Sequence, residues 1–184
     1  METAQAIALL GFVILAALVA LFARRAGRVL YRTRIAENFR GATADLDARV
    51  NQSLGEVADV IDVVRRHEVE SSSIRASLVA AQDAALRYAD EARALTGPPA
   101  AKLDQARMVE ELERAERALA LVEHGCELAS EGARSERGPE AETSIKRGYL
   151  NLLHARESFS EHARAAIDVA EAASPARSFG RRSG

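Results

Sequence analysis

The stretch LDARVNQSLGEVADVIDVV at residues 46–64 decides the fold. Its apolar residues recur every three or four positions, and they are Leu46, Val50, Leu54, Val57, Ile61 and Val64. This spacing places them on one stripe of an α-helix. Because a single apolar stripe cannot bury itself, the helix must pack against other helices. The segment therefore predicts a bundle of amphipathic helices.

Three segments further along the chain repeat this pattern. Their stripes are Leu78, Ala81, Ala85, Tyr88, Ala92 and Leu95; Met108, Leu112, Ala115, Leu119, Val122, Cys126 and Ala129; and Ile145, Tyr149, Leu152, Arg156, Phe159, Ala163, Ala166, Ala170 and Ala173. Leu150, Leu153 and Ile167 are expected to widen the last stripe, in which Arg156 is the one polar residue. So many alanines predict close approach of the helices and a modest hydrophobic gain per layer.

Glycine and proline mark the connections between these segments. At residues 96–99 the prolines cannot continue a helix, and Gly97 can adopt a left-handed cap. Residues 132–142 form a second predicted loop, in which Pro139 suits the first turn of the following helix. The polar stretch 67–73 is either a break between two helices or a polar layer in one long helix. The two loops favour an antiparallel up-and-down bundle of three to four long helices over residues 35–174, rather than an extended coiled coil.

The N-terminal segment predicts a membrane anchor. Residues 3–23 read TAQAIALLGFVILAALVALFA, and about 20 apolar residues suffice to span the hydrocarbon core of a bilayer. Five arginines follow, with no acidic residue before Glu37: Arg24, Arg25, Arg28, Arg32 and Arg34. By the positive-inside rule, the N-terminus lies outside and the remainder in the cytoplasm. A secretory signal peptide is the alternative, but it would carry its positive charge before a shorter apolar run.

These segments give an expected domain organisation. Residues 1–23 form a single transmembrane anchor, residues 24–34 a basic juxtamembrane segment, residues 35–174 a cytoplasmic helical bundle and residues 175–184 a flexible tail. The fold class is therefore all-α, with a single-pass topology in the inner membrane. The five arginines are expected to flank the membrane among anionic headgroups.

Composition limits the classes of function. The 184 residues carry a net charge of −2 and include 38 alanines, 23 arginines, two lysines and a single cysteine, Cys126. A single cysteine excludes an intrachain disulfide, and the Val/Ile-rich strands of an α/β enzyme are absent after residue 23. Abundant Ala and Arg with little Lys suggest a bacterial source. Residues 35–184 carry a net charge of −6, which disfavours binding to nucleic acid.

The sequence predicts no catalytic, cofactor or metal site. No glutamate lies three residues before any of His67, His124, His154 or His162, so the Glu-x-x-His pairs of di-iron bundles are absent. Cys126 lies on an apolar stripe and is expected to be a small buried hydrophobic residue. There is no glycine-rich phosphate loop, and no small-molecule substrate is evident.

The order of features resembles the LemA family. That family opens its core helix with Ala-x-x-x-Ile-Asp, which Ala42, Leu46 and Asp47 match, and Val50 stands at the position of the next leucine. Residues 57–64 keep the register of the family's Ile-Pro-Asn-Leu-Val-x-x-Val, with alanine in place of the proline.

The resemblance continues towards the C-terminus. His67-Glu68 is similar to a His-Glu pair of the family but lies three residues earlier. The family's C-terminal Arg-x-x-Tyr-Asn, proline and Phe-Gly motifs correspond in order and approximate spacing to Arg156, Phe159, Pro175, Phe179 and Gly180, with Ser160 in place of the asparagine. The resemblance implies an N-terminal anchor with an external tip, followed by a cytoplasmic antiparallel bundle. It implies no defined biochemical activity.

Two functions agree with these features. The first is a non-enzymatic scaffold that docks a protein partner, or a second copy of itself, at the inner face of a bacterial membrane. The second is a regulatory subunit that transmits a state of the bilayer or of a partner, with residues 67–73 as the candidate hinge. An enzyme is disfavoured because no site is found.

Overall fold

The computed structural model describes residues 2–66, 70–131 and 138–173, and for residues 2–32 it describes mainly the backbone. These residues form four α-helices and two short 3-10 helices, with no strand in the described ranges. The α-helices are α1 (Glu2–Arg65), α2 (Arg75–Ala94), α3 (Lys102–Glu131) and α4 (Gly138–Ala172). The 3-10 helices are η1 (Ser71–Ile74) and η2 (Pro99–Ala101). The prediction of an all-α bundle is confirmed.

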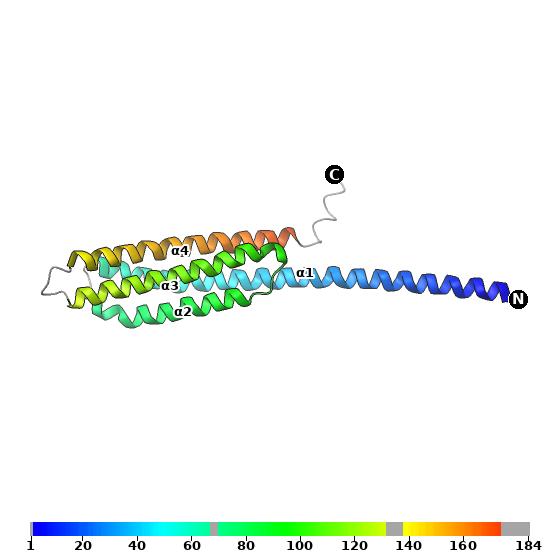
Figure 1. Ribbon diagram of the computed structural model, residues 1–184, viewed down its shortest axis with the longest axis horizontal. Coiled ribbons are helices and arrows are strands. Elements are labelled where there is room, and N and C mark those ends of the chain that lie inside the picture. Colours follow the sequence, from blue (N-terminus) through cyan, green and yellow to red (C-terminus); the bar gives the residue numbers. More distant parts are fainter. Residues whose placement is uncertain (1, 67–69, 132–137, 174–184) are drawn as a thin grey trace, which may run out of the picture.

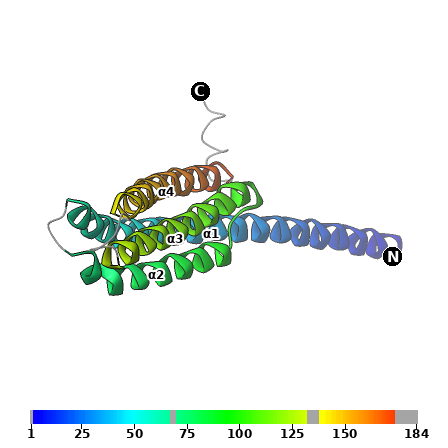
Figure 2. The same ribbon diagram turned by 60° about the vertical axis from the view of Figure 1, so that its left-hand side comes forward.

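The four helices run antiparallel to their neighbours along the chain, and α1 projects far beyond the other three (Figure 1). At about 1.5 Å per residue, the 64 residues of α1 extend over about 96 Å. Within the bundle, α1 packs mainly on α4, α4 on α3, and α3 on α2. We call the end from which α1 emerges the projecting end, and the opposite end the distal end. A second view shows the same arrangement (Figure 2).

The core consists of the predicted stripes. Every member of the stripe at residues 46–64 is buried, and so are most members of the other three stripes. The largest fully buried side chains include Phe39 and Phe159, on α1 and α4. Some predictions at the margins of the stripes were wrong: Leu150 is 45% exposed, Ala173 is exposed and Ala129 is only half-buried. Instead, the small residues Gly148 and Ala155 widen the buried face of α4.

The connections explain where the helices end. Helix α1 ends at Arg65 and η1 precedes α2, so the polar stretch at 67–73 belongs to the connection between two antiparallel helices and is not a layer in one long helix. In η1, the Ser73 backbone N–H and Oγ both donate to the Glu70 carbonyl, at 3.1 and 2.7 Å. Residues 67–69 lie outside the described residues. Pro139 lies in the first turn of α4 as predicted, but this helix already begins at Gly138.

Gly97 has a different role from the predicted one. Its backbone is not in the left-handed region; α2 ends at Ala94, and the residue that caps it is Leu95, with φ −57° and ψ 126°. A Cβ atom on Gly97 would lie 2.6 Å from two ring carbons of Phe39. The glycine is therefore needed because the α2–α3 connection passes directly over the buried Phe39 ring.

The N-terminal part of α1 contributes no buried residue to the core before Ala36 among the side chains that are described. Within the part of the chain that the structure describes in full, none of the helices has an apolar stretch that could cross a membrane. Of the predicted anchor at residues 3–23, the structure describes the helical backbone and the exposed side chain of Leu21 only. The predicted tail at residues 175–184 lies outside the described residues.

Candidate functional site

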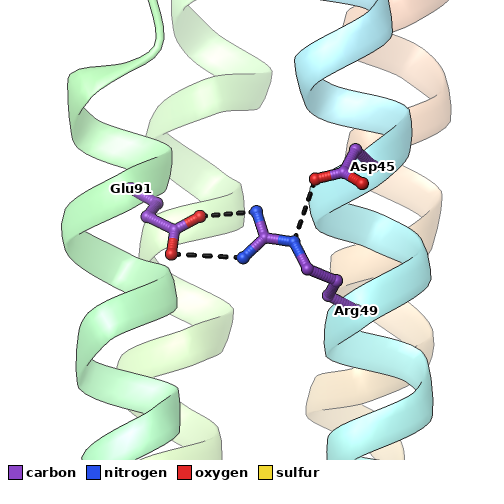
Figure 3. A network of polar contacts seen from close by, with 3 residues as sticks. All are labelled: Asp45, Arg49 and Glu91. Carbon is purple, nitrogen blue, oxygen red and sulfur yellow. Dashed lines mark hydrogen bonds and ion pairs between the residues drawn. The ribbon is translucent and has the colours of Figure 1, made fainter.

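A polar cluster around Arg49 joins α1 to α2 across the surface of the bundle (Figure 3). The Arg49 guanidinium donates to both carboxylate oxygens of Glu91, from Nη1 at 3.2 Å and from Nη2 at 2.6 Å, and its Nε donates to Asp45 Oδ2 at 2.9 Å. The guanidinium carbon lies 5.6 Å from the centre of the Tyr88 ring, within the range of a cation–π contact. Arg49 therefore binds two carboxylates and an aromatic face at once.

The carboxylates of this cluster stabilise the charged form of Arg49. The hydrogen bond with Glu91 is the main cause that raises the pKa of Arg49 above its usual range; desolvation opposes this rise and Asp45 adds to it. The side chains of Arg49 and Glu91 are 42% and 45% exposed. Solvent-exposed ion pairs of this kind contribute only about 0.2–1 kcal/mol each. The cluster can set the register of α1 against α2.

A second polar cluster joins α1 to α4. The Asn51 side-chain amide donates to Ser160 Oγ at 2.7 Å and to Asp47 Oδ1 at 2.9 Å, and Ser160 Oγ donates to Asp47 Oδ1 at 2.7 Å. Ser160 is buried, and its hydroxyl is satisfied by these two neighbours. The three side chains close a hydrogen-bonded ring at the α1–α4 interface, which is typical of a structural contact.

A crevice of about 410 Å³ lies at the distal end of the bundle, between the start of α2 and the end of α3. It is lined by Ser71, Ser72, Arg75, Leu78, Glu123, Cys126, Glu127 and Ser130. Arg75 forms ion pairs with Glu123 and Glu127, so the positive charge in the crevice is already neutralised.

Cys126 is 4% exposed at the floor of this crevice, which confirms its prediction as a buried residue. Burial is the main cause that raises the pKa of its thiol to about 11, and the charge of Glu123 adds to the effect. At neutral pH the sulfur is a thiol and not the nucleophilic thiolate. His124, two residues away, is exposed on another face of α3. Cys126 is therefore not an activated nucleophile.

The other titratable residues do not assemble into a site in the described ranges. His154 is exposed, and His162 lies 3.8 Å from Asp104, measured from Nδ1 to Oδ1. His67 lies outside the described residues. The described part of the chain holds no group of three or more His, Cys, Asp or Glu side chains that could bind a metal ion.

The predicted membrane-flanking arginines all lie on α1, beyond the bundle. Arg24 and Arg34 are exposed, while the side chains of Arg25, Arg28 and Arg32 lie outside the described residues. The Arg49 cluster was not predicted from the sequence. Its one signal is that Tyr88 and Glu91 are three residues apart on one helix face, but nothing in the sequence pairs that face with α1.

Comparison with known proteins gives no further assignment. No family model, curated protein or solved structure matches the chain. Conclusions about function therefore depend on the residues and the geometry alone.

Proposed function

We propose that the chain is a membrane-anchored, non-enzymatic helical bundle that docks a protein partner at the inner face of a bacterial membrane. The observation that carries this proposal is the continuity of α1, which runs as one helix from Glu2 to Arg65. A single element thus contains the apolar segment 3–23, the five arginines and a quarter of the bundle core.

The length of α1 sets the distance between the bilayer and the bundle. Ala36, the first buried residue of the core among the described side chains, comes 13 positions after Ala23, the last apolar residue of the proposed anchor. At 1.5 Å per residue, the core begins about 20 Å beyond the hydrocarbon. The headgroup layer occupies roughly 5–8 Å of this distance. The bundle is therefore held clear of the lipid, where all its faces can be reached by another protein.

The outer face of α2 is the best candidate for docking. Val79 and Leu86 lie two helical turns apart on this face and are 42% and 47% exposed. The hollow around Val79 is also lined by the small residues Ala76 and Ala80. Exposed apolar residues grouped on one face are typical of protein interaction sites.

The proposed topology is tested by protease digestion. Protease added to spheroplasts should spare the bundle and digest it only after lysis, because the bundle is proposed to lie in the cytoplasm. A bundle digested from outside would contradict the topology.

The docking proposal is tested by co-purification in mild detergent. The wild type should retain a partner or a second copy, and the variant Val79→Asp with Leu86→Asp should lose it. Leu150→Asp is the matched control, because Leu150 is equally exposed but lies on α4. A wild type that is monomeric and without a partner would contradict the scaffold.

A regulatory subunit is the second candidate. It is favoured by the different interfaces of the bundle: α1 meets α2 through the exposed Arg49 cluster, whereas α3 and α4 interlock at Gly148. The substitution Arg49→Gln loosens the first interface without changing Val79 or Leu86. If the protein is a scaffold, the Arg49→Gln variant should bind its partner as the wild type does. If the protein is a transmitting subunit, the fraction of the variant that carries a bound partner should differ from that of the wild type.

The resemblance to the LemA family leads to the same topology and remains a prediction. The inner-membrane location, the orientation of α1 and the lack of a catalytic activity are parts of this proposal.

A further inference from the structure

The outer face of α2 carries an open hollow of the kind that a side chain from a facing helix fills. Helix α2 lies along one edge of the bundle (Figures 1 and 2). Four of the residues that line the hollow are Ala76, Val79, Ala80 and Asp83. They stand at positions i, i+3, i+4 and i+7 of one helix, which is the four-residue hole of knobs-into-holes packing. All four are exposed, so no described side chain covers the hole.

The same face of α2 also carries a side chain that fits such a hole. Leu86 comes seven residues after Val79, so both lie on one stripe of the helix. Their exposed fractions are 47% and 42%. Because a straight helix cannot insert a side chain into its own hole, the knob must come from another chain. A second copy supplies both a knob and a hole, and in a two-fold contact each copy fills the hole of the other.

An antiparallel pair of α2 helices makes this contact in one register. When Leu86 of each copy lies over Val79 of the other, the two-fold axis passes between residues 82 and 83. This register places Arg75 of each copy opposite Asp90 of the other, and these two side chains are 62% and 78% exposed. The apolar contacts and the charges are therefore complementary in the same register.

A parallel pair lacks this complementarity. Each residue would then face its own counterpart, so Asp83, Arg87 and Asp90 would each meet a like charge, which is costly across an interface. In the antiparallel register, the two Asp83 carboxylates beside the axis are the like charges that come close on this face. The charges of α2 thus favour the antiparallel orientation.

We infer that the outer face of α2 binds the same face of a second copy in antiparallel orientation, with Leu86 of each copy in the hollow at Val79 of the other. This inference names the occupant of the docking face and, to that extent, rests on the proposed function. Because α1 is one continuous helix, the two stalks leave such a dimer in opposite directions. Two anchored copies then belong to two bilayers that face each other, and the dimer links them.

The length of α1 sets the distance between these bilayers. Arg49 of α1 pairs with Glu91 of α2, so these two residues lie at one level of the bundle. The two-fold axis lies about eight residues further along both helices, near Val57 of α1. That level is about 34 residues beyond Ala23, or about 51 Å from the hydrocarbon. The two hydrocarbon surfaces are therefore expected to lie about 100 Å apart.

The orientation is tested by cross-linking full-length chains in mild detergent. Each chain carries Cys126→Ala, so that the engineered cysteine is its only thiol. Ala76→Cys in one chain lies almost opposite Asp90→Cys in another, whereas two copies of either variant hold their cysteines about 20 Å apart along the helix axes. A short bis-maleimide should therefore link the mixture several-fold more than either variant alone. Stronger linkage within each single variant would show a parallel pair and overturn the inference.

The knob and the hole are tested by the dimer fraction in sedimentation velocity over a range of protein concentrations. Leu86→Asp removes the knob and Ala80→Leu fills the hole, so both variants should be monomeric. Asp83→Asn should raise the dimer fraction, because it removes the repulsion beside the axis. Leu150→Asp, on α4, is the matched control and should dimerise as the wild type does. Circular dichroism checks that each variant is folded, and folded Leu86→Asp that still dimerises would overturn the inference.

Two further outcomes separate this inference from the proposed function. A wild-type chain that stays monomeric but retains another protein, which Leu86→Asp releases, overturns the inference and leaves the docking function intact. A wild type with neither a second copy nor another partner overturns both. Vesicles that carry the bundle on their outer surface should cluster, and vesicles with Leu86→Asp should stay dispersed. Dispersed wild-type vesicles would contradict the link between two bilayers.

Discussion

At the scale of single residues, the closest packing in the bundle depends on glycine. A Cβ atom on Gly148 of α4 would lie 2.5 Å from Val122 Cγ2 and 2.7 Å from the Ala118 carbonyl oxygen of α3. A Cβ on Gly125 of α3 would likewise lie 2.7 Å from Ile145 Cγ1. Two glycines on facing helices thus let the backbones of α3 and α4 approach each other closely.

The variant Gly148→Ala should therefore destabilise the fold. Its methyl group meets backbone atoms, so the helices must move apart, and overpacking of this kind costs about 1–3 kcal/mol. The measurement is urea unfolding of the full chain in mild detergent, followed by circular dichroism. Gly41→Ala is the control: its Cβ would meet nothing within 4 Å. That variant should gain about 0.5–1 kcal/mol because alanine favours the helix. Equal stabilities of the two variants would contradict the close approach.

Cys126 gives the fold a dependence on alkaline pH. Burial raises the pKa of its thiol from an ordinary value near 9 to about 11 in the folded chain. The folded state therefore binds the proton more tightly than the unfolded state. The resulting stability is complete below pH 9 and is lost as the pH rises towards 11.

We expect the urea midpoint of the wild type to fall more steeply between pH 9 and 11 than that of Cys126→Ala. Native Cys126 should also react with a thiol reagent with an apparent pKa near 11. Rapid alkylation at pH 8 in the folded state would contradict both expectations.

At the scale of helices, α1 and α2 are joined by charge where α3 and α4 are joined by close packing. The Arg49–Glu91 pair is bidentate but its two side chains are 42% and 45% exposed. A double-mutant cycle with Arg49→Gln and Glu91→Gln should give a coupling energy of about 0.2–1 kcal/mol that decreases with added salt. The cycle is measured by urea unfolding. A coupling well above this range that is independent of salt would show that the pair is desolvated.

The helices themselves are largely predictable from the sequence, because a buried stripe leaves a period in the chain. The apolar stripe residues from Leu46 to Val64, and those from Met108 to Cys126, are buried as their spacing predicts. The exposed Leu150 could not be predicted, because a residue at the edge of a stripe is buried only if a neighbouring helix covers it.

The contacts between helices were harder to predict. The ring of Phe39 beneath Gly97 is an example, since Gly97 looks like an ordinary cap in the sequence. The Arg49 cluster joins residues 42 positions apart, and its members follow no spacing rule that a sequence shows. Arg156 on the α4 stripe is similar: its Nη1 lies 3.1 Å from where a Cβ on Gly55 would be, so a glycine on α1 makes room for it. Such pairs become visible only when the helices are placed together.

At the scale of the whole molecule, the bundle should fold without the rest of α1. The core begins at Ala36, and residues before it add no buried side chain among those described. We expect the fragment 35–174 to stay in solution and to unfold cooperatively in urea. Its free energy of unfolding should lie within about 1 kcal/mol of the full chain in detergent, because changes far from packed contacts have small effects.

A fragment that begins at residue 51 is the matched control, since it removes Ala36, Phe39, Thr43, Leu46 and Val50 from the core. The loss of one large core side chain already costs about 2–5 kcal/mol. The loss of several such side chains together is comparable with the roughly 5–15 kcal/mol that stabilise an ordinary domain. The shorter fragment also exposes the apolar face of α4 against which this half of α1 packs. It should therefore aggregate or remain unfolded. If the fragment 35–174 behaved in the same way, the anchor and its stalk would be part of the folding unit, and the bundle could not be a separate domain carried on α1.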